Sequence, residues 1–396
     1  MSDIRFEGWL HKTGTGGVYQ DAAGNVGIAS TQPKTRLDIQ NGAFQIGPAG
    51  ICTATTVNTT NLVNATPLSN RNVIINGAMQ VFQRTTSIAD VGNSNGYFAA
   101  DRYRFSQSGA ARFTISQSTD TPDGFGSSMK VDVTTANASP SAGQYVFFQH
   151  RIEGQNVQQF AKGSSAAKQY ALSFHVKSPK TGVHCMELDD VQNTRSCSGS
   201  YTVNSANTWE KKTIIFPADT TGAITNDNAN RFQLHMWLMA GTTYSGGTLN
   251  TTWGSVVHAN RAAGQVNLID NTSNNFFITG IQLEIGSVAT PFEHRSIGDE
   301  LIRCQRYFQS YPHDDTTTAD GLRLNGDYSS VFQTPMRDVP TGTVYGVGGT
   351  AGGNSGKYDK DAVGNTTAAI ETKHSGFEID TDGGVGLAAV TLDAEI

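Results

Sequence analysis

The sequence predicts a mainly β protein built around a jelly-roll β-sandwich. Charged residues make up only 16% of the chain, against about 25% in a typical soluble domain. Glycine accounts for 43 of 396 residues, and several segments alternate apolar and polar residues with a period of two. Short alternating segments separated by turn residues are typical of antiparallel sheets with one buried face.

The first 70 residues predict two segments outside the sandwich. Residues 1–48 are glycine-rich and contain strand-like pieces at Asn25–Ile28 and Arg36–Ile39, so we expect a small β shaft or anchor segment. Residues 49–70 are rich in Thr and Asn, nearly uncharged and without helical period. They predict an extended linker.

Residues 71–295 predict the sandwich itself. Turn clusters such as Asp123–Gly124 and Gly246–Gly247 separate its strands, and one short helix is expected at Asn156–Ala161. Alternation is clear in three segments, and their apolar members should face the core. These members are Tyr170, Leu172, Phe174 and Val176, then Phe232, Leu234, Met236 and Leu238, and finally Ile281, Leu283 and Ile285.

Residues 296–312 predict a helical connector, followed by a small C-terminal β domain over 313–396. Ser296 and Asp299 form a capping pattern for a helix over 297–309. One helical face would then carry Ile297, Leu301, Cys304 and Phe308. Beyond it, Val331–Phe332 and Val344–Tyr345 predict strands.

Composition and motifs argue against several classes of protein. The net charge of −6 with no basic stripe predicts no nucleic-acid partner and no anionic membrane target. No apolar run reaches the ~18 residues of a membrane span, and residues 1–7 contain no signal core. The chain has only four cysteines, which predict free thiols in a reducing cytoplasm. It has neither a CxxC nor an HExxH motif, so we predict no metal site and no cofactor.

No segment carries a catalytic signature. The glycine-rich run from Gly346 to Lys357 has Ala351 and Tyr358 where a phosphate loop needs Gly and Ser or Thr. Three carboxylates, Glu187, Asp189 and Asp190, could suit a glycosidase, but a solvated hairpin tip is the favoured interpretation. We therefore predict no enzyme and no catalytic residue.

Tryptophan positions suggest a sugar-binding surface. Strand alternation places Trp237 opposite Leu234 and Leu238, on the polar side of its strand. An exposed ring there could stack on a sugar, but the favoured interpretation is that another subunit or domain covers it. The candidate glycan-binding residues are Trp237, His235 and Trp253, with a core or strand-end role as the alternative for Trp253.

Several segments resemble a β-sandwich domain of tailed-bacteriophage virion proteins. The resemblance extends over about residues 70–310 and is weaker at both ends. Its segments are Asn72–Gln80, Gly96–Tyr103, Ile152–Asn156, Leu172–Ser178, Trp209–Ile214, Asp219–Gly222, Thr279–Gly286, Ala289–Arg295, Cys304–Phe308 and Leu392–Ile396. The pieces Gly24–Ile28 and Leu37–Ile39 are similar to a short shaft repeat of phage fibres.

The resemblance implies a structural, sugar-facing virion component with a sandwich like that of carbohydrate-binding modules. Such proteins are tail fibres, spikes or head fibres and are usually homotrimers. Such modules often hold a structural calcium, but here Gln80 and Thr279–Gly280 stand where charged ligands would be needed. The calcium site is therefore not predicted.

Three functions follow in order of preference. The first is a non-enzymatic, trimeric fibre- or spike-type adhesin that contacts host-surface polysaccharide. The second is a capsid decoration or connector protein that packs on other virion proteins without binding sugar, and the third is a polysaccharide-degrading spike. In the first two, residues 1–70 would contact other virion proteins, and the protein would be assembled in the host cytoplasm into a tail appendage or the capsid surface.

Overall fold

A computed structural model describes the chain in two parts, which are treated separately. The larger part comprises residues 70–312, 322–324, 328–346, 355–357, 367–373, 375–381 and 385–396. In the N-terminal part, only Ala22 and six strands are described. These strands are β1 (Gly8–Leu10), β2 (Gly17–Gln20), β3 (Val26–Ile28), β4 (Leu37–Ile39), β5 (Phe44–Ile46) and β6 (Cys52–Ala54). The predicted linker lies mostly outside the described residues.

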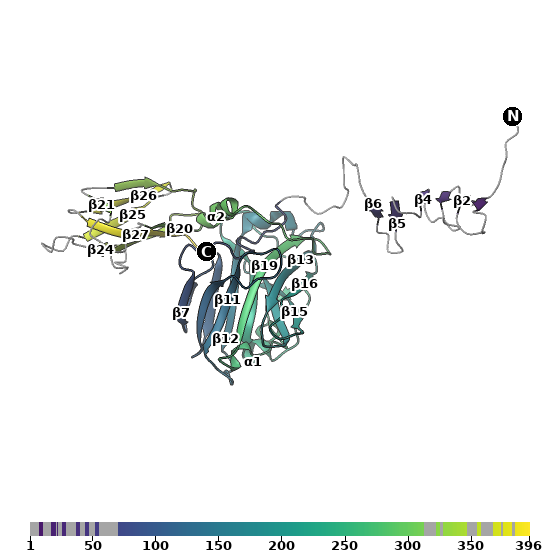
Figure 1. Cartoon of the computed structure of the whole chain (residues 1–396), viewed down its shortest axis with the longest axis horizontal. Coiled ribbons are helices and arrows are strands. Elements are labelled where there is room, and N and C mark those ends of the chain that lie inside the picture. The colour runs from purple at the N-terminus through teal and green to yellow at the C-terminus, as the bar shows by residue number, and fades with distance from the viewer. Residues whose placement is uncertain are drawn as a thin grey trace, which may run out of the picture. The chain divides into compact units, whose positions relative to one another are not determined.

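The larger part contains a sandwich of two antiparallel sheets (Figure 1). The six-stranded sheet has the order β16 (Glu210–Phe216), β13 (Tyr170–Lys177), β19 (Asn275–Ile285), β11 (Ser128–Thr135), β10 (Arg112–Ser118) and β7 (Ser87–Val91). The seven-stranded sheet has the order β18 (Gly254–Ser255), β15 (Arg195–Val203), β14 (Gly182–Asp190), β17 (Asn230–Ala240), β12 (Tyr145–Glu153), β9 (Tyr103–Ser108) and β8 (Asn95–Tyr97). The chain crosses repeatedly between the sheets, which confirms the predicted mainly β jelly-roll class.

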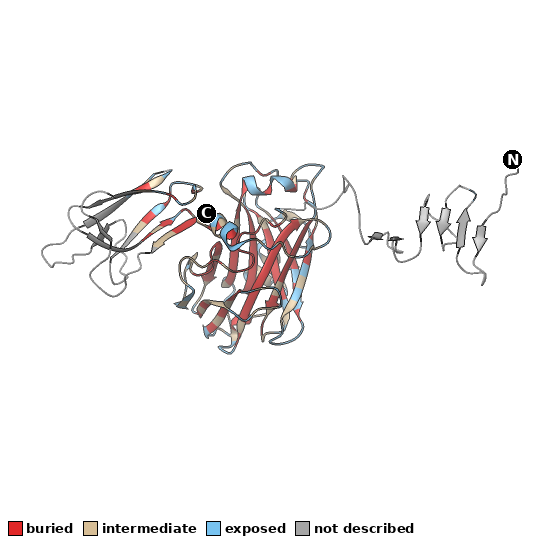
Figure 2. Ribbon diagram, turned by 45° about the horizontal axis from the view of Figure 1, so that its top comes forward, coloured by how far each residue is buried: buried red, intermediate tan, exposed pale blue. Residues whose placement is uncertain are grey.

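A large apolar core lies between the two sheets. The strands of both sheets consist largely of buried residues (Figure 2). The core contains the predicted inward residues of β13 and β17, together with Ile281 and Leu283 of β19. Ile285 is half-buried and packs against it. The alternation therefore identified the buried face of each of the three strands correctly.

Helices are short and lie between strands. They are η1 (Gly154–Phe160), α1 (Thr242–Ser245), η2 (His258–Asn260), η3 (Leu268–Asp270) and α2 (Ile297–Gln305). The expected helix at Asn156–Ala161 corresponds to η1, which buries Val157 and Phe160.

Helix α2 begins as predicted but ends early. The Ser296 hydroxyl accepts a hydrogen bond from Asp299 N at 3.1 Å, so the N-cap is confirmed. The expectation of a helix to residue 309 is wrong, because the chain turns after Gln305 and Phe308 begins strand β20. The predicted apolar face is also partly wrong: Cys304 is buried, but Ile297 is 57% exposed.

The C-terminal region forms two small sheets. The first comprises β20 (Phe308–Pro312), β27 (Val385–Asp393), β21 (Leu322–Leu324) and β23 (Thr341–Gly346). The second comprises β22 (Tyr328–Val331), β26 (Gly376–Thr381), β25 (Thr367–Thr372) and β24 (Ser355–Lys357). The predicted strands near Val331 and Val344 correspond to β22 and β23, whereas most of Gly346–Lys357 lies outside the described residues.

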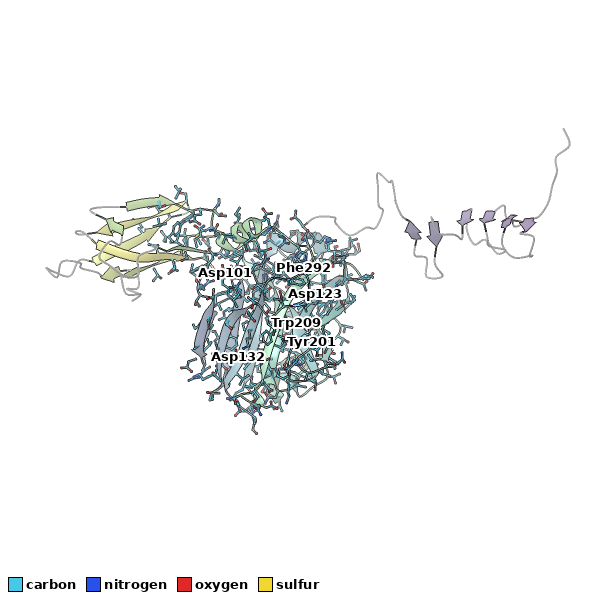
Figure 3. The ribbon with its side chains drawn as sticks, viewed as in Figure 1. Asp101, Asp123, Asp132, Tyr201, Trp209 and Phe292 are labelled. Atoms are coloured by element: carbon cyan, nitrogen blue, oxygen red, sulfur yellow. The ribbon has the colours of Figure 1, made fainter. Side chains whose placement is uncertain are left out.

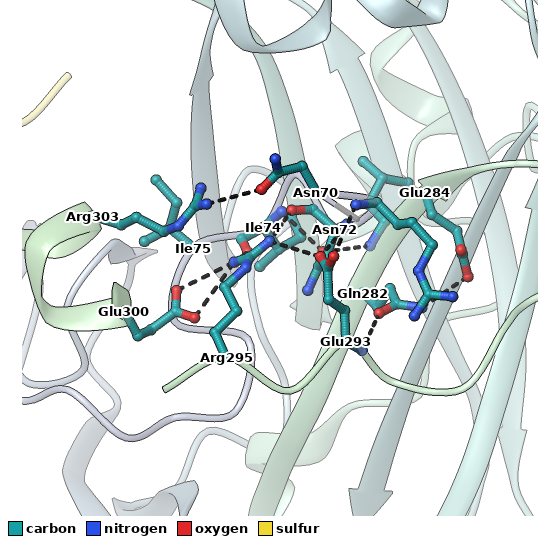
Figure 4. A network of polar contacts seen from close by, with 12 residues as sticks. Asn70, Asn72, Ile74, Ile75, Gln282, Glu284, Glu293, Arg295, Glu300 and Arg303 are labelled. Carbon is teal, nitrogen blue, oxygen red and sulfur yellow. Dashed lines mark hydrogen bonds and ion pairs between the residues drawn. The ribbon is translucent and has the colours of Figure 1, made fainter. Parts of the chain in front are cut away.

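Polar contacts join the entry and exit of the sandwich (Figure 4). Asn72 donates through Nδ2 to Ile281 O at 2.9 Å and accepts at Oδ1 from Leu283 N at 3.0 Å. The Glu293 carboxylate accepts from Asn72 N at 3.0 Å. Beside them, a Cβ on residue 77 would lie 2.2 Å from Ile281 O, so only glycine fits at Gly77. These contacts involve the segments that carry the sequence resemblance.

The hairpin of β14 and β15 contains two of the cysteines and corrects the expectation for the acidic cluster. Cys185 pairs with Ser200 and Cys197 with Leu188, and both cysteines are free thiols. The acidic cluster is not a solvated hairpin tip, because Glu187 and Asp190 are fully buried. Strand alternation directs Glu187 and Asp190 to opposite faces of the sheet.

Candidate functional site

The candidate site is the outer face of the seven-stranded sheet, which points away from the core. Strand register aligns four polar residues in one row across β9, β12, β17 and β14. Arg104 pairs with Gln149, Gln149 with His235, and His235 with Glu187. A neighbouring row contains Arg151, Gln233 and Asp189. We refer to these seven residues as the polar rows.

Hydrogen bonds connect the polar rows across the sheet. Gln149 accepts at Oε1 from Arg104 Nη1 at 3.1 Å and donates through Nε2 to Gln233 Oε1 at 3.1 Å. With its proton on Nε2, His235 donates to Gln233 Oε1 at 2.7 Å. The ring then accepts at Nδ1 from Arg261 Nη2 at 2.9 Å. Because each side chain is held by the next, the face presents its polar groups in fixed directions.

Glu187 anchors one end of this network. It accepts from Arg261 Nε at 2.8 Å and from Trp237 Nε1 at 3.2 Å. Burial alone would raise the pKa of Glu187, but its contacts with His235 and Arg261 outweigh this effect and lower the pKa. Glu187 has no exposed surface, so it cannot touch a substrate as a glycosidase carboxylate would. Burial raises the pKa of Asp189, whose carboxylate accepts from Arg261 Nη2 at 3.4 Å.

An aromatic cluster adjoins the polar rows. Phe147 stacks on His235 with ring centres 5.0 Å apart and on Tyr145 at the same distance. Tyr244 of α1 packs against Trp237 at 5.6 Å. Tyr145 and Tyr244 are the half-buried members, so their rings contribute aromatic surface to this face.

The structure places Trp237 beneath this face and not on its surface. The side chain points to the predicted side of β17, but it is only 1% exposed, because Phe147, Tyr244 and Arg261 cover it. Phe147 belongs to β12, whereas Tyr244 and Arg261 belong to the connection between β17 and β19. His235 lies beside it and is 2% exposed. The expected exposed platform at Trp237 is therefore not found, and the glycan-binding role of these residues stays a prediction.

Trp253 is not brought together with Trp237. Its Nε1 donates to Pro217 O at 2.9 Å, and its ring packs against the core residues Tyr170 and Phe232. This position corresponds to the alternative interpretation of Trp253 as a core anchor. Trp209 immediately precedes β16 (Figure 3), and its Nε1 donates to Asp120 Oδ1 at 2.9 Å.

The described residues provide neither a group of metal ligands nor a helix that could span a membrane. Among the described residues, no group of three or more His, Cys, Asp or Glu side chains is placed to hold a metal ion. Gln80 and Thr279 do not gather carboxylates, and Thr279 instead donates to Ser127 O at 2.8 Å. None of the helices that the structure describes is long and apolar enough to span a membrane.

Sequence reasoning did not identify the polar rows. A usable signal exists in Tyr145–Glu153, where alternation places Phe147, Gln149 and Arg151 on one face. The opposite face carries Val146, Phe148 and His150. Since both faces of the strand contain aromatic residues, hydropathy alone does not show which face is the polar one.

Three solved structures that resemble this chain are 8–13% identical to it in sequence. No family model and no curated protein matches the sequence. Among solved structures, the enzymatically active domain of bacteriophage CBA120 tailspike protein 4 is 13% identical, with a TM-score of 0.28, over 54% of this chain and 21% of that one. A family 11 carbohydrate-binding module from Clostridium thermocellum, in complex with a β-1,3-1,4-mixed-linked tetrasaccharide, is 12% identical, with a TM-score of 0.26, over 52% and 99%.

A third structure, TmCBM61 in complex with β-1,4-galactotriose, is 8% identical, with a TM-score of 0.27, over 55% of this chain and 99% of that one. The chain thus spans only about a fifth of the tailspike chain that it matches.

Proposed function

We propose that this protein is a non-enzymatic structural component of a tailed-phage virion that binds host-surface glycan through the outer face of its seven-stranded sheet. One observation carries the proposal: half-buried Arg104, Arg151 and Asp189 lie on one rigid face with the ring of Tyr145. Sugars present hydroxyl groups in fixed directions and apolar C–H faces, so oriented polar groups beside an aromatic ring suit them.

The virion role is supported by the sequence resemblance of residues 70–310. In this proposal the chain is a homotrimeric fibre- or spike-type adhesin, and residues 1–70 attach it to other virion proteins. Three copies would bind a repetitive polysaccharide more tightly than one, because later contacts form at a high effective concentration.

Binding to a glycan array tests the proposal directly. The wild-type protein should bind at least one bacterial surface polysaccharide, and Tyr145→Ala should weaken this binding about tenfold by removing the aromatic surface. Phe125→Ala is the matched control, because Phe125 is a half-buried ring near the six-stranded sheet. No binding by folded wild-type protein would contradict glycan recognition.

Location and assembly need separate measurements. Gold-labelled antibody against residues 300–396 should mark the tail appendages of intact virions. Label over the capsid, together with no glycan binding, would instead favour the capsid decoration or connector protein. Light scattering should give three times the chain mass of 42.2 kDa, and a monomer would contradict the trimer.

A further inference from the structure

We propose that the chain has a second glycan site, on the outer face of the six-stranded sheet, where the Trp209 ring stacks on a neutral sugar. This inference rests on the glycan recognition proposed above and adds a separate binding surface to it. The residues of this surface, which we call the second face, are Trp209, Asp120, Lys177, Lys130 and Asp132.

The Trp209 ring is half-buried, and its neighbours hold it in one orientation. Its Nε1 donates to Asp120 Oδ1 at 2.9 Å, and the ring packs against Phe277 with ring centres 6.1 Å apart. The ammonium group of Lys177 lies 5.8 Å from the centre of the Trp209 ring. A ring that is already oriented loses little conformational freedom when a sugar stacks on it, so less of the binding energy is lost to ordering.

Strand register places two lysines beside this ring in one row. Lys177 of β13 pairs with Phe277 of β19, and Phe277 pairs with Lys130 of β11. The Phe277 ring is buried, with the two ammonium groups at 4.8 Å and 5.5 Å from its centre. Since the row alternates with the core-facing residues of these strands, it points away from the core.

The second face also offers hydrogen-bond acceptors. Asp120 accepts from Lys177 and Trp209, yet its side chain is 44% exposed, so its oxygens are open to further donors. The hydrogen bond from Lys177, together with that from Trp209, lowers the pKa of Asp120 and keeps this acceptor ionised. Asp132 is half-buried and pairs with Lys130 at 2.8 Å.

These groups match a neutral sugar. The two ammonium groups and the two carboxylates pair with one another, so the second face has no unbalanced charge that would require a charged ligand. Sugar hydroxyl groups can donate to the carboxylates and accept from the ammonium groups. The apolar C–H side of the same sugar can lie on the Trp209 ring.

The experiment counts sugar sites on the full-length protein. Wild-type protein is screened on an array of neutral and charged bacterial surface polysaccharides. The repeating-unit oligosaccharide of a bound neutral polysaccharide is then used in equilibrium dialysis at saturation. We expect two bound oligosaccharides per chain for wild type and one for Trp209→Ala, whereas Trp209→Phe, which keeps an aromatic ring, should retain two. On the intact polysaccharide, Trp209→Ala should weaken binding about tenfold, because one of two linked contacts is lost.

Ile215→Ala is the matched control. Ile215 is 39% exposed and follows Trp209 by six residues, so it lies on the same side of β16 at a distance of roughly 20 Å. This variant should still bind two oligosaccharides. Circular dichroism should show that Trp209→Ala is folded, and light scattering should give it the mass of wild type. A smaller mass would show that the second face contacts another copy of the chain and would overturn the glycan assignment.

The two levels of the proposal fail differently. One oligosaccharide per wild-type chain that is lost in Tyr145→Ala and kept in Trp209→Ala would overturn the second site and leave the proposed function intact. The reverse result would support the second site and overturn the site on the seven-stranded sheet. Binding confined to charged polysaccharides would overturn the neutral ligand. No polysaccharide bound by folded wild-type protein would overturn the proposed function and this inference with it.

Discussion

Lys162 lies inside one edge of the sandwich with almost no exposed surface. Its ammonium group donates to Asp190 and contacts Asp219 Oδ2 at 2.9 Å. It also donates to the backbone oxygens of Thr221 and Gly222, each at 3.0 Å. Four oxygens thus surround one buried cation, which joins the end of β14 to the segment after β16.

Lys162→Met should destabilise the protein by about 3–5 kcal/mol, because it leaves the buried Asp190 carboxylate without its cation. Urea unfolding followed by circular dichroism measures the change. Lys168→Met, at an exposed position, should stay within about 0.5 kcal/mol of wild type. Equal stability of Lys162→Met and wild type would show that the ion pair does not hold this edge.

Asp101 should make stability depend on pH in the acidic range. Burial raises its pKa to about 6, against the lowering effects of Arg84 and Gln83. Since the folded-state pKa exceeds the ordinary value of 3.8, the stabilising contribution is complete below about pH 4 and is lost as the pH rises through about 6.

The Asp101→Asn variant isolates this effect. The stability of wild type relative to Asp101→Asn should be greater at pH 4 than at pH 7 by about 2 kcal/mol. Urea unfolding at several pH values measures this difference. A constant difference between the two proteins over this range would contradict the raised pKa of Asp101.

At the residue scale, the sequence predicted the direction of site side chains but not their contacts. Alternation predicted which side of β17 carries Trp237, because the direction of a side chain follows from strand geometry. It could not predict that α1 and Arg261 fold back over that ring, because this contact joins residues from a separate segment of the chain. The convergence of Arg104 and Arg151 on Gln149 was likewise hidden, since it depends on the pairing register of β9 and β12.

At the scale of elements, local signals predicted where α2 begins but not where it ends. Its start depends on Ser296 and Asp299, three residues apart. Its end depends on Phe308 entering β20, whose partner β27 lies more than 70 residues later in the chain. A capping pattern contains no information about such distant pairing.

Ser296→Ala should destabilise the protein by about 1 kcal/mol, because Asp299 N loses its hydrogen-bond acceptor at the helix start. Thermal unfolding should show a small decrease in Tm. Ser287→Ala serves as the control, since Ser287 is exposed and outside any helix. If both variants melt at the same temperature, the cap does not contribute to stability.

At the scale of the whole molecule, arginine–carboxylate pairs connect residues 393–396 to the sandwich. The buried Arg102 side chain pairs with Glu395 and lies over the Tyr307 ring at 3.4 Å. Arg102 also donates to Arg151 O at 2.6 Å, so the same contact supports an arginine of the polar rows. Arg337 donates to Ala394 O at 3.2 Å and adds a further connection.

Glu395→Gln should therefore be far more harmful than a change at a neighbouring surface charge. It leaves the buried guanidinium of Arg102 without a carboxylate, for an expected loss of about 3–5 kcal/mol in the free energy of unfolding. Asp393→Asn removes a carboxylate that also pairs with Arg84 but is 46% exposed, so its expected cost is at most about 1 kcal/mol. Urea unfolding of the full chain measures both. Similar losses for the two variants would mean that the buried Arg102–Glu395 pair is not what holds residues 393–396 to the sandwich. Apolar packing would then be the main contribution to this contact.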